Sequence, residues 1–123
     1  MSDRATVERL VDRFFQAVRD CDMSHLPLAD QASYSGTMLP EPARGAAAVR
    51  QHMADTAPFI KSFGIEETVI ENQAAAVLVR YEAVNGVQFE GCYFLEVENG
   101  LITRIRTVFD SRPLMTGGPD RRP

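Results

Sequence analysis

The sequence predicts an α+β domain, with a cone-like curved antiparallel sheet packed on N-terminal helices. The N-terminal half places apolar residues at spacings of three and four, which is the period of a helix buried on one face. The C-terminal half instead alternates apolar and polar residues, and Asn-Gly pairs separate the alternating runs. Helices followed by consecutive hairpins are typical of a fold in which the helices cover one face of a meander.

The first helix is expected from about residue 7 to residue 18. Its apolar stripe consists of Val7, Leu10, Val11, Phe14, Phe15 and Val18. Thr6 is expected to be its N-cap, and the pattern ends at Asp20-Cys21-Asp22. Beyond it, Ser24 is expected to cap a single helical turn that has Pro27 among its first residues.

A short strand over residues 32–35 and a second helix are expected next. The segment GTMLPEPARG, with two prolines and two glycines, is expected to separate them as a loop. The second helix should follow Gly45 and end near Pro58. Its apolar row consists of Ala46, Val49, Met53 and Ala57.

Four strands are expected over about residues 62–71, 74–84, 87–98 and 101–110. Two of their connections are Asn85-Gly86 and Asn99-Gly100, and Asn-Gly predicts a type I′ turn because both central residues need a positive φ. The domain is expected to span residues 1–112. Residues 113–123 contain too few apolar side chains to pack and are expected to form a flexible tail.

Composition limits the classes of function. A net charge of −4 and a pI near 5.1 argue against a nucleic-acid partner, which calls for a basic patch. No apolar run approaches the ~20 residues of a membrane-spanning helix, and MSDRATVERL lacks the apolar segment of a signal peptide. Cys21 and Cys92 lie on different predicted elements and have no metal-ligand spacing. Because the sequence also shows no secretion signal, we expect free thiols in a cytoplasmic protein, and no membrane partner.

Motifs for cofactors and metals are absent from the sequence. It contains no dinucleotide-binding glycine pattern, no phosphate-binding loop, no zinc-protease motif and no nucleophile elbow. No cofactor is therefore expected. The two histidines, His25 and His52, fall on separate elements, and the simplest interpretation of each is a surface or rim side chain.

The segment VRYE raises the question of which strand face is buried. Arg80 and Glu82 point to one side of their strand, whereas Val77, Val79 and Tyr81 point to the other. An exposed Arg80–Glu82 pair would contribute at most about 1 kcal/mol. A buried pair would need further partners to offset desolvation of several kcal/mol per ion. The sequence leaves both interpretations open, with the apolar side favoured for the core.

Two other polar residues are candidates for chemistry. Asp110 closes the last strand, where a carboxylate at the mouth of a curved sheet suits acid–base work, although an Asp there also commonly starts a turn. Asp110 shares its face with Arg104 and Arg106, so a bulge or strand curvature would be needed to turn it inward. Tyr34, on the predicted first strand, would add a hydroxyl. The residues expected to line the cavity are Phe14, Phe15, Met53, Leu78 and Tyr93.

Two segments resemble a known family. LADQASYSGTMLPEPARGAAAVRQHM and the closing GLITRIRTVFD are similar to the SnoaL-like branch of the nuclear-transport-factor superfamily, and the likeness extends over about residues 5–112. It implies a cone of curved antiparallel sheet closed by N-terminal helices, an apolar cavity and a homodimer. Such proteins include polyketide cyclases, steroid isomerases, dehydratases, epoxide hydrolases and binding proteins without chemistry.

A narrower resemblance concerns limonene-epoxide-hydrolase-like enzymes. Arg80-Tyr81-Glu82 looks like their Arg-x-Asp with Glu for Asp, Asp110 matches a second Asp, and Tyr34-Ser35-Gly36 keeps the Tyr of Tyr-x-Asn but lacks the Asn. The likeness implies that Asp110 takes a proton from water with help from Tyr34. Glu82 would then protonate the epoxide oxygen, and Arg80 would bridge the two acids. Gly36 has no side chain to hold the water.

Four functions are compatible with these patterns. The first is cofactor-independent acid–base chemistry, such as cyclisation, isomerisation or hydration, on an apolar small molecule with Asp110 handling the proton. The second is a ligand-binding or dimerisation module without chemistry, and epoxide hydrolysis is a further alternative. A partner-binding adaptor would instead expose an apolar patch around Val77, Val79 and Tyr81.

Overall fold

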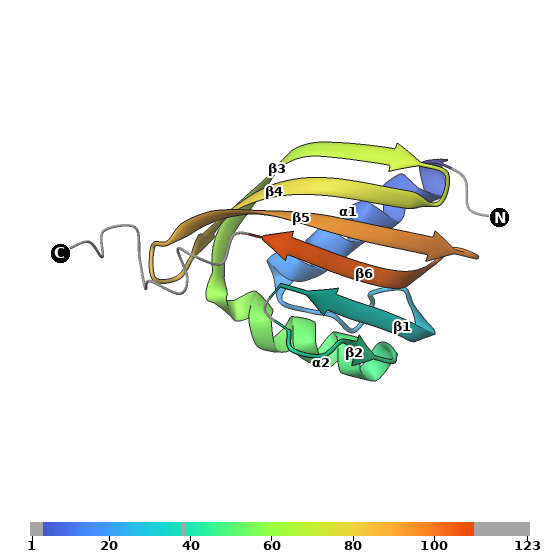
Figure 1. Ribbon diagram of the computed structural model, residues 1–123, viewed down its shortest axis with the longest axis horizontal. Helices are drawn as coiled ribbons and strands as arrows, with labels where there is room; N and C mark the ends of the chain where they lie inside the picture. Colours follow the sequence, from blue (N-terminus) through green and yellow to red (C-terminus); the bar gives the residue numbers. More distant parts are fainter. Residues whose placement is uncertain (1–3, 38, 110–123) are drawn as a thin grey trace.

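Two α-helices and one sheet make up the fold in the computed structural model, which describes residues 4–37 and 39–109 (Figure 1). In chain order the elements are α1 (Arg4–Asp20), β1 (Leu28–Gly36), β2 (Ala43–Arg44), α2 (Ala46–Thr56), the 3₁₀ helix η1 (Ala57–Phe59), β3 (Ile60–Glu71), β4 (Ala74–Ala83), β5 (Gln88–Glu98) and β6 (Leu101–Phe109). The predicted α+β class is confirmed, and the four long C-terminal strands begin and end close to their predicted positions.

The strands form one six-stranded sheet in the order β2-β1-β6-β5-β4-β3. Strands β3 to β6 are an antiparallel meander, as the consecutive hairpins predict. The first strand differs from expectation, because β1 pairs in parallel with β6 and continues the sheet beyond the meander. The open sheet curves around α1, and α2 lies beside β1 and β2 (Figure 1).

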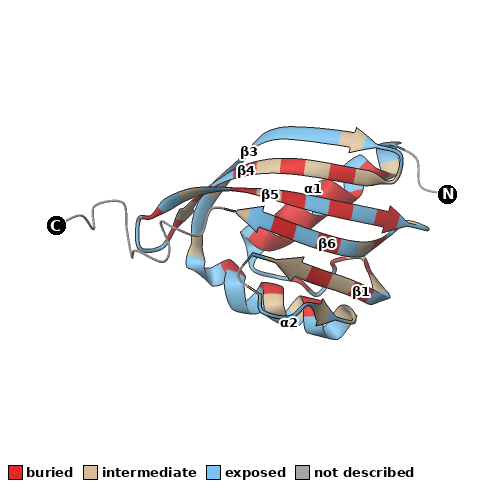
Figure 2. Cartoon of the chain, viewed as in Figure 1, coloured by how far each residue is buried: buried red, intermediate tan, exposed pale blue. Residues whose placement is uncertain are grey.

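The core lies between α1 and the concave face of the sheet. The predicted stripe of α1 is buried, including Phe14 and Phe15, and Figure 2 shows the buried side of this helix against the strands. Along β4 burial alternates, so that Val77, Val79 and Tyr81 face the core. These three residues are therefore not the exposed patch that an adaptor would need.

Several local predictions were wrong. Thr6 lies inside α1 and is not its N-cap. Ser24 does not cap a helical turn that contains Pro27; it lies within a single turn that the Leu26 N–H closes on the Met23 carbonyl at 3.2 Å. Its backbone N–H and hydroxyl donate to the Asp22 carboxylate at 3.0 and 2.6 Å. The short strand is longer than expected, because β1 begins at Leu28.

The two Asn-Gly pairs form different turns. Asn99 and Gly100 both have positive φ, of 53° and 76°, as a type I′ turn requires. At the other pair only Gly86 has a positive φ. The Ala83 N–H donates to the Val87 carbonyl at 2.8 Å, which leaves a three-residue loop in which a single left-handed glycine suffices.

Three further expectations concern the C-terminal segment, membrane-spanning helices and the cysteines. The proposed tail, residues 113–123, lies outside the described residues. Among the helices that are described, none is long and apolar enough to cross a membrane. Cys21 and Cys92 are both free thiols, one after α1 and the other on β5.

Gly36 fixes how closely β1 approaches β6. It is paired with Thr107, and a Cβ added at Gly36 would collide with the buried hydroxyl of that threonine. We expect Gly36→Ala to lower the free energy of unfolding by about 1–3 kcal/mol, measured by urea denaturation, because overpacking strains a close-packed site.

Gly64→Ala is the matched control, since Gly64 also lies in a strand but no atom lies within 4 Å of the added Cβ. It should leave stability unchanged. Equal stability of the two variants would contradict the close β1–β6 contact, whereas partial recovery in the Gly36→Ala, Thr107→Ala double variant would support it.

Candidate functional site

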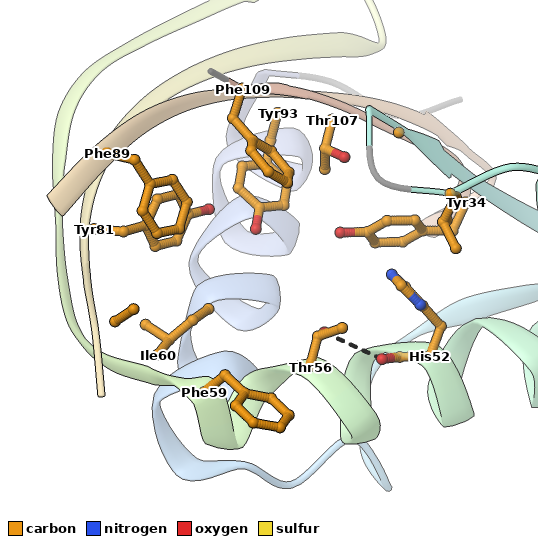
Figure 3. Close-up of a pocket in the computed structure, with 13 residues that line it drawn as sticks. Tyr34, His52, Thr56, Phe59, Ile60, Tyr81, Phe89, Tyr93, Thr107 and Phe109 are labelled. Atoms are coloured by element: carbon orange, nitrogen blue, oxygen red, sulfur yellow. Dashed lines mark hydrogen bonds between the residues drawn. The ribbon is translucent and has the colours of Figure 1, made fainter. Parts of the chain in front are cut away.

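A pocket of about 330 Å³ opens between the helices after β2 and the concave face of the sheet (Figure 3). Side chains from α2, η1 and five strands converge on it because the sheet curves over α2 and η1. The described lining residues are Tyr34, Gly36, Leu39, His52, Thr56, Phe59, Ile60, Tyr81, Ala83, Phe89, Tyr93, Thr107 and Phe109. None of these carries a formal charge at neutral pH except His52 when protonated. The pocket is therefore an apolar chamber with a few polar groups.

The three tyrosines of the chain all line this pocket. Tyr34 comes from β1, Tyr81 from β4 and Tyr93 from β5, and their residues are only 7%, 4% and 9% exposed. Their hydroxyls point toward a common region of the pocket (Figure 3). The β4–β5 hairpin and the distant strand β1 thus bring three hydrogen-bond donors together within an apolar wall.

Burial controls the protonation of these phenols. Desolvation raises the pKa of Tyr34, Tyr81 and Tyr93, since the charged phenolate is disfavoured away from water. The Thr107 hydroxyl acts in the opposite direction on the pKa of Tyr34, but burial outweighs it. All three tyrosines are consequently neutral donors at physiological pH.

The Tyr81 hydroxyl is distinctive because it is buried and has no hydrogen-bond partner within the part of the chain that the structure describes. The Tyr93 hydroxyl is close enough to influence its pKa, but the two do not complete a hydrogen bond of normal geometry. A buried hydroxyl without a partner costs about 1–3 kcal/mol. The pocket therefore retains an unused donor.

His52 is the titratable group on the helical side of the pocket. It projects from α2, and its ring lies 4.6 Å from the ring of Tyr34, centroid to centroid (Figure 3). Burial lowers the pKa of His52, and the nearby Asp55 offsets this only in part. A neutral imidazole at pH 7 has one nitrogen free to accept a proton.

Aromatic rings hold the tyrosines in place. Tyr81 stacks on Phe89 with centroids 4.8 Å apart and an interplanar angle of 18°. Phe14 and Phe15 each contact Tyr93 edge-on, at 5.4 and 5.3 Å. The Tyr93 ring is thus fixed from the core side, which leaves little freedom for its hydroxyl to move away from the pocket.

Only some of the residues that were expected to line the cavity do line the pocket. Tyr34 and Tyr93 are among the lining residues. Phe14, Phe15 and Met53 instead lie in the core behind it, because they fill the contact between the helices and the sheet. Leu78 faces the other side of β4 and is half-buried there.

Arg80 and Glu82 do not reach the pocket. The Arg80 side chain is 58% exposed and pairs with Glu90 at 2.9 Å and Glu66 at 3.3 Å. Glu82 lies 3.7 Å from Lys61 on the same convex face. The cause is the alternation of the strand, since Tyr81 points inward and its neighbours must point outward.

The proposed acid pair therefore has no structural basis on β4. Arg80 was expected to bridge Glu82 and Asp110 inside the cavity, but both Arg80 and Glu82 form ion pairs on the exposed convex face instead. Asp110 lies outside the described residues. Exposed pairs of this kind contribute about 0–1 kcal/mol to stability.

Sequence reasoning missed Tyr81 and His52 as site residues. Tyr81 lies on the face that alternation favours for the core, so its inward direction was available from the pattern. His52 is next to the buried Met53 on α2, which placed it at the margin of an apolar row. No local signal revealed that these residues meet, because they belong to different elements.

The described residues contain no cluster of side chains that could ligate a metal ion. Within residues 4–37 and 39–109, no group of three or more His, Cys, Asp or Glu side chains could hold a metal ion.

Known proteins share both the sequence pattern and the architecture of this chain. A family model described as a SnoaL-like domain matches residues 11–105. No curated protein matches the chain. An NTF2-like protein of unknown function from Mesorhizobium loti is similar, with 22% identity, a TM-score of 0.79, and coverage of 89% of this chain and 96% of that one.

Two similar structures bear functional names. A steroid delta-isomerase from Pseudomonas aeruginosa has 14% identity and a TM-score of 0.76, with 87% of this chain and 81% of that one covered. A putative SnoaL-like polyketide cyclase from Jannaschia sp. has 13% identity and a TM-score of 0.77, with 94% and 96% covered. At these identities the likeness shows the shared fold.

The tyrosines provide a direct test of the pocket, since the chain has no tryptophan and no tyrosine elsewhere. We expect the folded protein to show no tyrosinate absorbance as the pH passes about 10, where unfolded tyrosines ionise. Above that pH the unfolded state binds fewer protons than the folded state, so the contribution of the tyrosines to stability is constant below about pH 10 and falls above it. The slope is about 1.4 kcal/mol per pH unit for each tyrosine.

Ultraviolet absorbance and near-ultraviolet circular dichroism should be recorded together, with the urea-unfolded chain as control. Tyrosinate absorbance that rises near pH 10 while the dichroism stays native would contradict the burial of these hydroxyls.

Proposed function

The chain belongs to the SnoaL-like domain family, and we propose that its pocket binds an apolar small molecule and performs cofactor-independent acid–base chemistry on it. The observation that carries the proposal is the convergence of a neutral imidazole and three buried phenols on one apolar chamber. Isomerisation or cyclisation is the class of reaction that these groups suit best.

The proposed reaction needs only the side chains described. The free nitrogen of His52 takes a proton from a carbon of the bound molecule, and the electron pair of that bond moves onto an oxygen conjugated with the carbon. Tyrosine hydroxyls donate to that oxygen as its charge develops. In an isomerisation the histidinium returns the proton at another carbon of the enolate. In a cyclisation the enolate carbon attacks a carbonyl carbon of the same molecule, the π electron pair of that carbonyl moves onto its oxygen, and the histidinium gives its proton to this oxygen.

Asp110 remains a second proton-handling group in this proposal. It follows Phe109, which lines the pocket, directly in the sequence. Epoxide hydrolysis is not proposed, because Arg80 and Glu82 point away from the pocket.

A ligand-binding module without chemistry is the second candidate. It is favoured by the absence of a carboxylate among the described lining residues, which leaves His52 as the proton acceptor of the described pocket. The two candidates differ in whether His52 changes a rate or only an affinity.

We expect His52→Ala to slow proton exchange of an enolisable probe by about 10²-fold or more, because a positioned base contributes about 10²–10⁴-fold. The probe is 2-tetralone in D₂O, with loss of its α-proton signal followed by NMR. The wild-type rate should rise with pH through a midpoint below about 6.5 and then level off, since the pKa of His52 is lowered and the neutral form is active.

His25→Ala is the matched control, since this exposed histidine lies in the loop before β1 and does not line the pocket. This variant should exchange the α-proton of the probe at the wild-type rate. A third variant, Asp110→Asn, measures how much Asp110 contributes to the exchange rate. Equal rates for wild type and His52→Ala, with 2-tetralone bound by both, would favour the binding module.

We also propose that a second copy of the chain covers the convex face of the sheet. Val69 and Phe94, which flank Ala76 in adjacent strands, are 58% and 41% exposed. This row is bordered by charges of both signs, Glu67 on β3 and Arg106 on β6, which a two-fold pairing could bring together.

Sedimentation should therefore give a dimer at micromolar concentration, and Phe94→Glu should give a folded monomer because it places a charge in the buried row. Val84→Glu is the control, since Val84 is similarly exposed but lies in the β4–β5 turn. A wild-type monomer would overturn the dimer and leave the pocket proposal unaffected.

A further inference from the structure

The unused Tyr81 donor indicates what the pocket selects. Tyr81 is 4% exposed and its hydroxyl points into the region shared with Tyr93 and Tyr34 (Figure 3). A hydroxyl proton rotates freely about its C–O bond, so the Tyr81 donor can turn to any acceptor that becomes available. Burial raises the pKa of Tyr81, and the Tyr93 hydroxyl partly offsets this because in the resting pocket Tyr93 is directed as a donor toward the Tyr81 oxygen. The Tyr93 oxygen can accept from Tyr81 only once Tyr93 turns its own proton to another acceptor.

The acceptor capacity of Tyr93 depends on where its own proton goes. When a bound oxygen accepts the Tyr93 proton, the lone pairs of the Tyr93 oxygen become better acceptors, because hydrogen bonds in a chain polarise one another. Tyr81 can then donate to Tyr93 while Tyr93 donates to the ligand. The bound oxygen thereby satisfies two hydroxyls at once, only one of which it touches.

The surroundings also limit the charge of the ligand. No lysine or arginine is among the described lining residues, and each titratable lining side chain is shifted toward its neutral form. An anion entering this chamber would lose its hydration without gaining a cation. A hydrocarbon would leave the donors unused.

We propose that Tyr81, acting through Tyr93, makes the pocket select neutral molecules with a carbonyl-type acceptor oxygen over hydrocarbons and over carboxylates of the same shape. This rests on the proposed function and specifies its ligand class. Tyr93 is the direct donor, and Tyr81 is a positioning residue that strengthens it. The ligand ring packs in the apolar chamber whose wall includes the Tyr81–Phe89 stack.

The pocket volume sets the size of the probes. About 330 Å³ corresponds to roughly eleven waters at about 30 Å³ each, which suits one fused pair of rings with a short substituent. Three such molecules differ only at the substituent: 2-acetylnaphthalene is a neutral ketone, 2-isopropenylnaphthalene replaces its oxygen by a methylene, and 2-naphthoate is an anion.

Equilibrium dialysis of the full chain at pH 7 gives the three dissociation constants. We expect the ketone to bind about tenfold more tightly than the hydrocarbon, the factor expected for a hydrogen bond worth about 1.4 kcal/mol. The carboxylate should bind at least tenfold more weakly than the ketone. Equal affinities for ketone and hydrocarbon, or tighter binding of the carboxylate, would overturn the proposal.

Variants separate the direct donor from the positioning residue. Tyr93→Phe should abolish the preference for ketone over hydrocarbon, whereas Tyr81→Phe should reduce it about threefold with the hydrocarbon affinity unchanged. The double variant should match Tyr93→Phe alone, because Tyr81 acts only through Tyr93. Independent, additive effects would show that Tyr81 contacts the ligand by itself and would overturn the relay.

Two controls keep the result interpretable. Tyr81→Phe removes a buried hydroxyl that lacks a partner, so its thermal midpoint should not fall. Phe89→Leu trims the ring stacked on Tyr81 and should weaken ketone and hydrocarbon to the same extent. If the ketone and the hydrocarbon bind with equal affinity, this inference is wrong but the proposed apolar binding pocket is still supported. If no probe binds, the proposed function fails with it.

Discussion

The pairing of β4 with β5 determines which side chains enter the interior. Tyr81 lies opposite Phe89 and Val77 opposite Tyr93, so the inward positions of both strands are aromatic or aliphatic. The intervening positions, including Arg80 opposite Glu90, form the ion pairs of the convex face. A slip of one residue would exchange the two sets and bury charges that have no partners. The large energetic difference between the two registers is what holds the pocket in place.

The curvature of the sheet then turns a set of inward residues into a site. The parallel pairing of β1 with β6 adds Tyr34 to the wall opposite Tyr81, and α2 brings His52 beneath it. The close approach of Gly36 to Thr107 belongs to the same seam between β1 and β6. Packing at that seam and the position of the Tyr34 hydroxyl are therefore linked, since one strand carries both.

The chemistry of the pocket follows from its low polarity. Burial pushes tyrosine and histidine alike toward their neutral forms, so the same environment supplies weakly acidic donors and a proton acceptor. Neither group needs a metal or a carboxylate to reach that state. The same environment leaves the Tyr81 hydroxyl buried without a hydrogen-bond partner among the described residues, a donor that the proposed ligand oxygen would satisfy through Tyr93.

Local patterns in the sequence determined the buried stripe of α1, the bounds of the four long strands and the tight turn at Asn99-Gly100. Each of these depends on residues a few positions apart, whose periodicity or φ preference is readable without the rest of the chain. Only the tertiary structure decided that Arg80 and Glu82 face water and that Tyr34, Tyr81 and Tyr93 meet near His52. The physical reason is distance along the chain: both strand faces carried enough apolar residues to be buried, and only packing against α1 and the turn of the sheet distinguishes them.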